Sequence, residues 1–322
     1  MRKLPVFRSV GEVFSGVFAH FFQLLRMAWL PIVIWLVISG VSNIWISSAD
    51  MPFTPEELEA MMAGNADPTV AETARARMQA LMPYVYGLIF VEYCFLSIIA
   101  VGFHRFVLLG ETGRGWGGSG LSVGRPELLY IWSIIKLGLL YVLALIVIAL
   151  VAVSISFALG ERDVVQTGAL GGRTIHPMAA VILIVGILAL MPVFARLFLV
   201  MPHVALGNRS QLREIWGRTQ GNGWRLVGYF LVVILTVGIA STVLILSAYA
   251  ILGLRLIPTP EEIAAMQNGW TQTLLHFVIG IPFWLVWTML TITMLSVAYR
   301  EIVGLPGGHE GEATVAEPSP GL

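Results

Sequence analysis

Charged residues are scarce in this sequence. Of its 322 residues only 12% are charged, whereas 57% are hydrophobic, and the mean hydropathy is +0.84. So few charges cannot cover the surface of a soluble domain of this length, which excludes the ordinary soluble classes. The composition therefore predicts an integral membrane protein.

Cysteine and recognisable catalytic motifs are nearly absent as well. The single cysteine, Cys94, lies in an apolar run, which excludes an intrachain disulfide and a cysteine-based metal site. The sequence contains no HExxH or Walker pattern. GRGWGG at 113–118 has the GxGxxG spacing, but it follows an apolar helix rather than a strand and has no acidic residue at the distance a ribose ligand requires. We therefore predict a non-enzymatic protein with no catalytic, metal or cofactor residues, and no nucleic-acid partner.

What the sequence does contain is a series of long apolar segments. About 20 mainly apolar residues cross a bilayer as a helix. Six segments meet this requirement, at 24–46, 82–109, 128–157, 178–206, 224–254 and 271–303. The sequence thus predicts an all-α bundle of six membrane spans in one domain, 1–303, followed by a disordered cytoplasmic tail at 304–322.

Lys and Arg are concentrated in the segments on one side of these spans, together with the N-terminus. Since positive charge marks the cytoplasmic side, we expect both termini in the cytoplasm and the protein in a bacterial inner membrane. We also expect anionic lipids at the cytoplasmic face as partners.

Two short amphipathic stretches precede spans on that side. In 209–219 the residues Leu212, Ile215, Trp216 and Thr219 form one stripe, which predicts a helix on the membrane surface that ends at the glycines of 221–223. A second stripe predicts a surface helix at 9–22. Its Ser9 and Glu12 have the spacing of a capping box.

Repeated segments suggest that the chain contains a duplicated unit. TPEELEAM at 54–61 matches TPEEIAAM at 259–266, and both predict strong helix starts on the outer side. The second and sixth spans also end alike, in VGFHRFVLLG and VAYREIVG. We interpret these as two copies of one unit, with the middle pair of spans as a weaker third copy. The alternative is chance similarity between two good helix starts.

One part of the chain resembles a known family. RLFLVMPHVALG, SQLREIWGRTQGNGWRL and the span that follows, about 196–231, resemble the YciC-like and glycerophosphoryl diester phosphodiesterase membrane-domain proteins of bacteria. The resemblance implies a six-helix inner-membrane protein. It implies no catalytic residue here, because the phosphodiesterase domain of the fused members is a separate soluble barrel.

Three charged residues fall inside predicted spans and form the candidate polar site. Glu92 should face the bundle interior, because an unpaired charge in lipid costs about 2.5 to 3.5 kcal/mol. It serves either as a proton or cation site, together with Tyr93, or as an interhelical hydrogen-bond partner. Lys136 and Arg196 lie at similar depth and either bind an anionic lipid headgroup or extend to the interface, one of them pairing with Glu92.

The histidines near span ends, His104, His203 and His276, are expected to contact headgroups. As a function we expect a scaffold or accessory factor in envelope or lipid homeostasis. The alternatives are a transporter or flippase for a small amphiphile and, third, a membrane enzyme acting on lipid phosphates.

Overall fold

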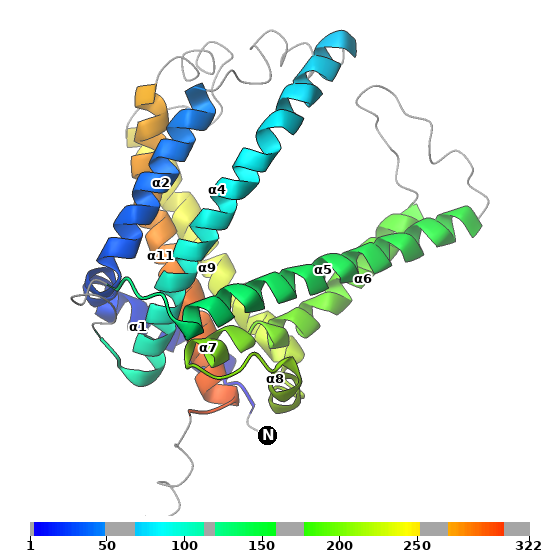
Figure 1. Cartoon of the computed structure of the whole chain (residues 1–322). Coiled ribbons are helices and arrows are strands. Elements are labelled where there is room, and N and C mark those ends of the chain that lie inside the picture. Colours follow the sequence, from blue (N-terminus) through cyan, green and yellow to red (C-terminus); the bar gives the residue numbers. More distant parts are fainter. Residues whose placement is uncertain (1–2, 49–67, 113–119, 159–176, 252–269, 306–322) are drawn as a thin grey trace, which may run out of the picture.

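The computed structural model describes residues 3–48, 68–112, 120–158, 177–251 and 270–305, and their regular elements are all helices (Figure 1). The prediction of an all-α fold is confirmed. In chain order the helices are α1 (Val6–Met27), α2 (Trp29–Ser48), α4 (Pro68–Leu109), α5 (Arg125–Ala158), α6 (Pro177–Leu197), α7 (Val200–Ala205), α8 (Leu212–Arg218), α9 (Gly223–Ile251) and α11 (Trp270–Ile302).

Five segments of these helices are long and apolar enough to cross a membrane. They are Gln79–Leu109, Arg125–Ile155, Met178–Ala205, Gly223–Ile251 and Gly280–Ile302. A sixth crossing arises if α1 and α2 are taken together, although the chain bends by 79° between them. This arrangement is that of a polytopic membrane bundle.

The bend between α1 and α2 corrects the predicted boundary of the first span. The surface helix does not end near residue 22 but continues to Met27, and the apolar helix begins at Trp29 rather than at residue 24. Pro31 explains the break, since it has no N–H and its ring would collide with the carbonyl of Met27 in a continuous helix. Within the first turn of a new helix the same proline is tolerated.

The predicted capping box at Ser9 is also wrong. α1 begins three residues earlier, and the backbone N–H of Ser9 already donates to the carbonyl of Pro5 at 2.9 Å. The Ser9 hydroxyl is buried and has no hydrogen-bond partner among the described residues. Glu12 instead forms ion pairs with Arg8 and Arg300, and the latter pair ties α1 to the end of α11.

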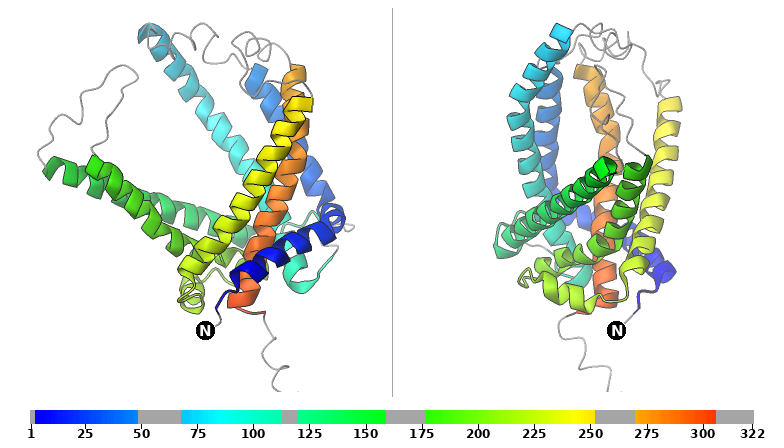
Figure 2. Two further views of the ribbon diagram at one scale, coloured as in Figure 1. Left: turned by 180° about the vertical axis from the view of Figure 1, so that it is seen from behind. Right: turned by 90° about the vertical axis from the view of Figure 1, so that its right-hand side faces the viewer.

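The core lies mainly toward one end of the molecule. Most of its buried residues come from α1, the second half of α4, α7, the first half of α9 and the second half of α11, and a few come from α2, α5, α6 and α8. Toward the other end the helices separate, and the hairpin of α5 and α6 leaves the remaining helices at a wide angle (Figures 1 and 2). Many apolar side chains on α5 and α6 are exposed there, which fits helices surrounded by lipid.

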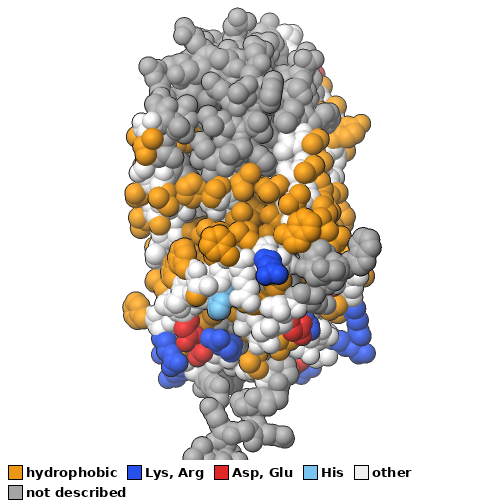
Figure 3. All heavy atoms as spheres, turned by 90° about the vertical axis from the view of Figure 1, so that its left-hand side faces the viewer, with side chains coloured by type: hydrophobic (Ala, Val, Ile, Leu, Met, Phe, Trp, Pro, Cys, Tyr) orange, Lys and Arg blue, Asp and Glu red, His pale blue; other side chains and the backbone are white. Residues whose placement is uncertain are grey.

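The surface is divided into an apolar region and a charged region. One face shows a broad apolar band above a belt of mixed basic and acidic side chains (Figure 3). The N-terminus and the final turn of α11 lie at the same end of the molecule (Figures 1 and 2). We refer to this as the inner end.

Three glycines give the structure a repeated feature. Gly110, Gly207 and Gly304 each follow the final helix of a hairpin, and each has a left-handed φ, of 69°, 89° and 84°. The three glycines are equally spaced in the sequence. The middle hairpin therefore ends with the same left-handed glycine as the other two, whose similar ends the sequence analysis had already noted. The TPEE segments lie outside the described residues, as does the predicted tail beyond residue 305.

Candidate functional site

The segment between α7 and α9 is the point at which several charged side chains converge. α8 begins at Leu212, later than predicted, and Ile215 and Thr219 of its apolar stripe are buried in the protein rather than lying in lipid. Gly221 adopts a left-handed φ of 77°, and α9 follows at Gly223, in agreement with the predicted glycine hinge.

Arg196, at the end of α6, binds this segment through neutral groups. Its Nε donates to Thr219 Oγ1 at 3.0 Å, and a terminal nitrogen donates to the carbonyl of Trp216. The guanidinium also lies 3.5 Å from the centroid of the Trp216 ring, a cation–π contact. Among the described residues, no carboxylate pairs with Arg196.

Lys136, on α5, binds the other end of the same segment. Its Nζ donates to Ser210 Oγ at 2.8 Å, and that hydroxyl also contacts Ser133 Oγ at 2.9 Å. Lys136 is half-buried and likewise has no acidic partner within the described part of the chain. Lys136 and Arg196 thus contact opposite ends of the segment, and neither has an acidic partner among the described residues.

The two cations lie at comparable depth, as predicted. Tyr141 of α5 packs edge-on against Phe194 of α6, with ring centroids 5.1 Å apart. Because the helices run antiparallel, Lys136 before Tyr141 and Arg196 after Phe194 both lie on the inner side of this contact. The structure shows no pairing of either cation with Glu92, so that alternative is wrong.

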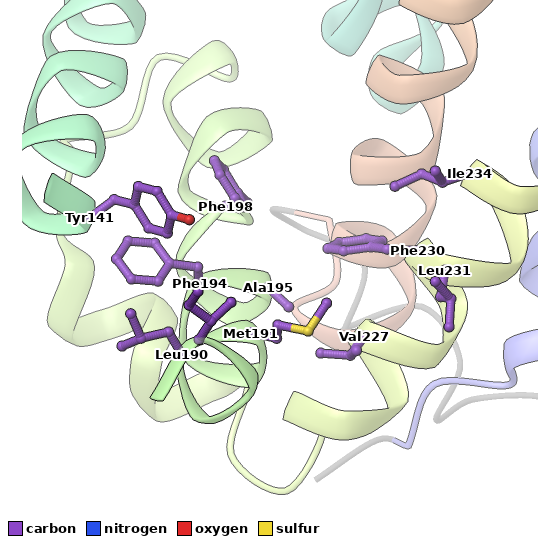
Figure 4. Close-up of a pocket in the computed structure, with 11 residues that line it drawn as sticks. Tyr141, Leu190, Met191, Phe194, Ala195, Phe198, Val227, Phe230, Leu231 and Ile234 are labelled. Atoms are coloured by element: carbon purple, nitrogen blue, oxygen red, sulfur yellow. The ribbon is translucent and has the colours of Figure 1, made fainter. Parts of the chain in front are cut away.

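An apolar cavity of about 250 Å³ adjoins Arg196 (Figure 4). We call it the α6–α9 cavity. Its lining comes from Tyr141 of α5, from Ile187, Leu190, Met191, Phe194, Ala195 and Phe198 on and just after α6, and from Val227, Phe230, Leu231 and Ile234 of α9.

Arg196 lies at the inner edge of this cavity. It follows Ala195, a lining residue, and its Cδ would lie 3.4 Å from a methyl group placed on Gly223. Gly223 is one helical turn before Val227, another lining residue. The cavity therefore combines an apolar interior with a cation at its inner edge.

Glu92 lies elsewhere, between α4 and α2. One of its carboxylate oxygens accepts a hydrogen bond of 2.7 Å from Ser39 Oγ on α2. The suggested partner Tyr93 is 51% exposed and has no contact with this carboxylate, because adjacent helical residues point in different directions. The structure therefore places the three candidate residues in two sites: Lys136 with Arg196, and Glu92 with Ser39.

The expectation that His104 contacts headgroups is wrong, because its side chain is fully buried. Nδ1 lies 2.7 Å from Ser296 Oγ, and Nε2 lies 3.3 Å from the Tyr130 hydroxyl. Ser296 Oγ donates to the carbonyl of Ile292, so it accepts from Nδ1–H, and Nε2 then accepts from Tyr130. A neutral histidine satisfies every group in this chain of hydrogen bonds.

His203 is buried in the same region and is also misassigned by the sequence prediction. Its Nδ1 lies 2.9 Å from the Tyr299 hydroxyl, and its Nε2 lies 3.9 Å from Glu214 of α8. The side chain of His276 lies outside the described part of the structure. The contacts of these two buried histidines join α4, α5, α7, α8 and α11 at the inner end. Both side chains therefore stabilise the packing of these helices.

Within the described segments, no group of three or more His, Cys, Asp or Glu side chains is placed to hold a metal ion. Sequence reasoning missed the partners that hold the cations, namely Ser210, Trp216 and Thr219. Nothing in their spacing indicates that they meet side chains from α5 and α6.

Comparisons of the chain with protein-family models, with characterised proteins and with solved structures find no match. The resemblance to the YciC-like and phosphodiesterase membrane-domain proteins therefore stays a prediction.

Proposed function

We propose that this protein is a non-enzymatic scaffold or accessory factor of a bacterial inner membrane that binds an anionic lipid at its inner end. The observation that supports this most directly is that neither Lys136 nor Arg196 has an acidic partner among the described residues, and that Arg196 lies at the inner edge of the apolar α6–α9 cavity. The excess of Lys and Arg on this side supports a cytoplasmic location for the inner end, and hence for both termini.

The remaining donors of both cations suit a phosphate group. Lys136 uses one of its three N–H donors on Ser210, and Arg196 uses two of its five on Thr219 and Trp216. A lipid phosphate beside either cation would supply a negative charge and accept charge-assisted hydrogen bonds. Lipid tails are as apolar as the cavity wall, so moving a tail from the bilayer into the cavity gains little binding free energy. We therefore assign the affinity to the headgroup, and the orientation of the bound lipid to its tail.

Native mass spectrometry of the protein released from lipid nanodiscs tests this. Lys136→Ala/Arg196→Ala should lose a bound anionic lipid that the wild type retains. The matched control is Arg209→Ala/Arg213→Ala, which removes the same charge from exposed side chains nearby and should retain the lipid.

Two further variants separate binding from loss of structure. Ala195→Leu keeps both cations and fills part of the cavity, and because the affinity is assigned to the headgroup it should retain the lipid. Thr219→Val removes an anchor of Arg196 but keeps its charge. The proposal is wrong if the control pair loses the lipid equally, if Ala195→Leu loses it completely, or if Thr219→Val alone reproduces the complete loss.

A second candidate function is a transporter or flippase for a small amphiphile. The observation in its favour is Glu92, a carboxylate inside a span with Ser39 as its hydrogen-bond partner. Glu92→Gln should then abolish substrate movement in reconstituted vesicles while membrane insertion is unchanged. Wild-type movement by this variant would exclude Glu92 as the coupling group.

A further inference from the structure

A second cavity, of about 430 Å³, lies between α2 and α4. We call it the α2–α4 cavity. Its walls are mainly apolar and include Val41 of α2 and Gly87, Leu88 and Val91 of α4. The hydroxyl of Ser42, which also lines it, donates to the backbone carbonyl of Ile38 at 2.7 Å.

The inner end of this cavity is next to a carboxylate. Glu92 follows the lining residue Leu88 by one helical turn on α4, and Ser39 precedes Ser42 by one turn on α2. Residues at these spacings share a helix face, so the Ser39–Glu92 pair lies directly inward of the cavity. From the described part of the chain, one hydrogen bond, donated by Ser39, reaches the Glu92 carboxylate, which offers about four acceptor positions.

No Lys, Arg or His side chain pairs with Glu92 among the residues that the structure describes. A carboxylate at this depth is costly unless it is protonated or meets a cation. A lipid tail in the cavity would fill the space but leave the charge unmatched. A metal ion would need several oxygen ligands, whereas this site offers one carboxylate, one shared hydroxyl and apolar walls.

We infer that the α2–α4 cavity binds a compact lipophilic ammonium ion, whose N–H groups donate to Glu92 while its apolar body packs against Leu88 and Val91. Charge complementarity selects the head, and the cavity selects the shape of the body. The site uses none of the residues assigned to lipid binding, so it stands or falls independently of that proposal.

Three probes with one apolar cage test this directly: 1-adamantanamine, 1-adamantanol and adamantane-1-carboxylate. Binding is measured by equilibrium dialysis of the labelled probes against the full chain in nanodiscs of a zwitterionic lipid, with empty nanodiscs subtracted. The amine should bind at least tenfold more tightly than the alcohol, and the carboxylate should not bind.

Two variants and a control complete the test. Glu92→Gln should remove the preference for the amine, whereas Glu72→Gln, an exposed position on the same helix, should leave it unchanged. Gly87→Leu adds a side chain to the cavity wall at a position where the Cβ atom would meet nothing within 4 Å, and it should abolish binding while Glu92 is intact. Equal binding of the amine and the alcohol, retention by Glu92→Gln or retention by Gly87→Leu would each overturn the inference.

Discussion

Replacing Gly120 by alanine should destabilise the protein far more than the same change at Gly110. Both glycines have a left-handed φ, of 78° and 69°, which costs an L-residue about 1–2 kcal/mol. A methyl group on Gly110 would meet nothing within 4 Å. At Gly120 it would lie 2.1 Å from the carbonyl oxygen of Met27 and 2.8 Å from the Cα of Ala28, at the corner between α1 and α2.

The contacted atoms at this corner belong to the backbone, so no side-chain rotation can relieve the overlap. Overpacking of this kind adds about 1–3 kcal/mol. We therefore expect Gly110→Ala to lower the free energy of unfolding by about 1–2 kcal/mol and Gly120→Ala by about 2–5 kcal/mol. Titration with sodium dodecyl sulfate in mixed micelles, followed by tryptophan fluorescence, measures both. Equal losses for the two variants would refute the argument that Gly120 is required by the close approach to Met27.

Two further predictions concern the buried contacts. His104→Leu leaves the Tyr130 hydroxyl without its acceptor and should lower the free energy of unfolding by about 1–3 kcal/mol in the same titration. The control His20→Leu, at an exposed position, should change the free energy of unfolding little. Similar losses for both variants would contradict the buried hydrogen-bond chain. Gly186→Val should destabilise the α5–α6 hairpin by about 1–3 kcal/mol, because even a Cβ atom there would lie 2.7 Å from Ile148. Combination with Ile148→Ala should recover part of this loss, and strictly additive losses would contradict the contact.

The helical fold could be predicted from the sequence because a bilayer imposes one simple requirement, a long apolar segment for each crossing. The break after Met27 was also readable in principle, since Pro31 cannot lie inside a continuous helix. The capping-box prediction was wrong although Ser9 and Glu12 fit the local pattern, because a distant contact acts just before the start of α1. The N–H of Leu4 donates to Asn222 Oδ1 at 3.1 Å.

The candidate site was less predictable. The positions of Lys136 and Arg196 in their spans indicated that the two residues lie at one level, but their hydrogen-bond partners are 20 to 74 residues away and leave no periodic signal. The roles of His104 and His203 were misassigned for a related reason. Proximity to a span end does not reveal whether a helix end is covered by other helices. Here α5 and α11 cover His104, and α8 and α11 cover His203.

The wide departure of the α5–α6 hairpin from the other helices has a mechanical consequence. α5 has 34 residues and is therefore about 50 Å long, while its polar ties to Ser210 lie near its inner end. The hairpin can thus rotate as a unit about the hydrogen bonds of Ser133 and Lys136 to Ser210. Ala158 lies about 33 Å beyond Lys136, so a rotation of about 10° about Lys136 moves the far end by about 6 Å, and small rearrangements around Lys136 and Arg196 become larger displacements at the other end of the hairpin.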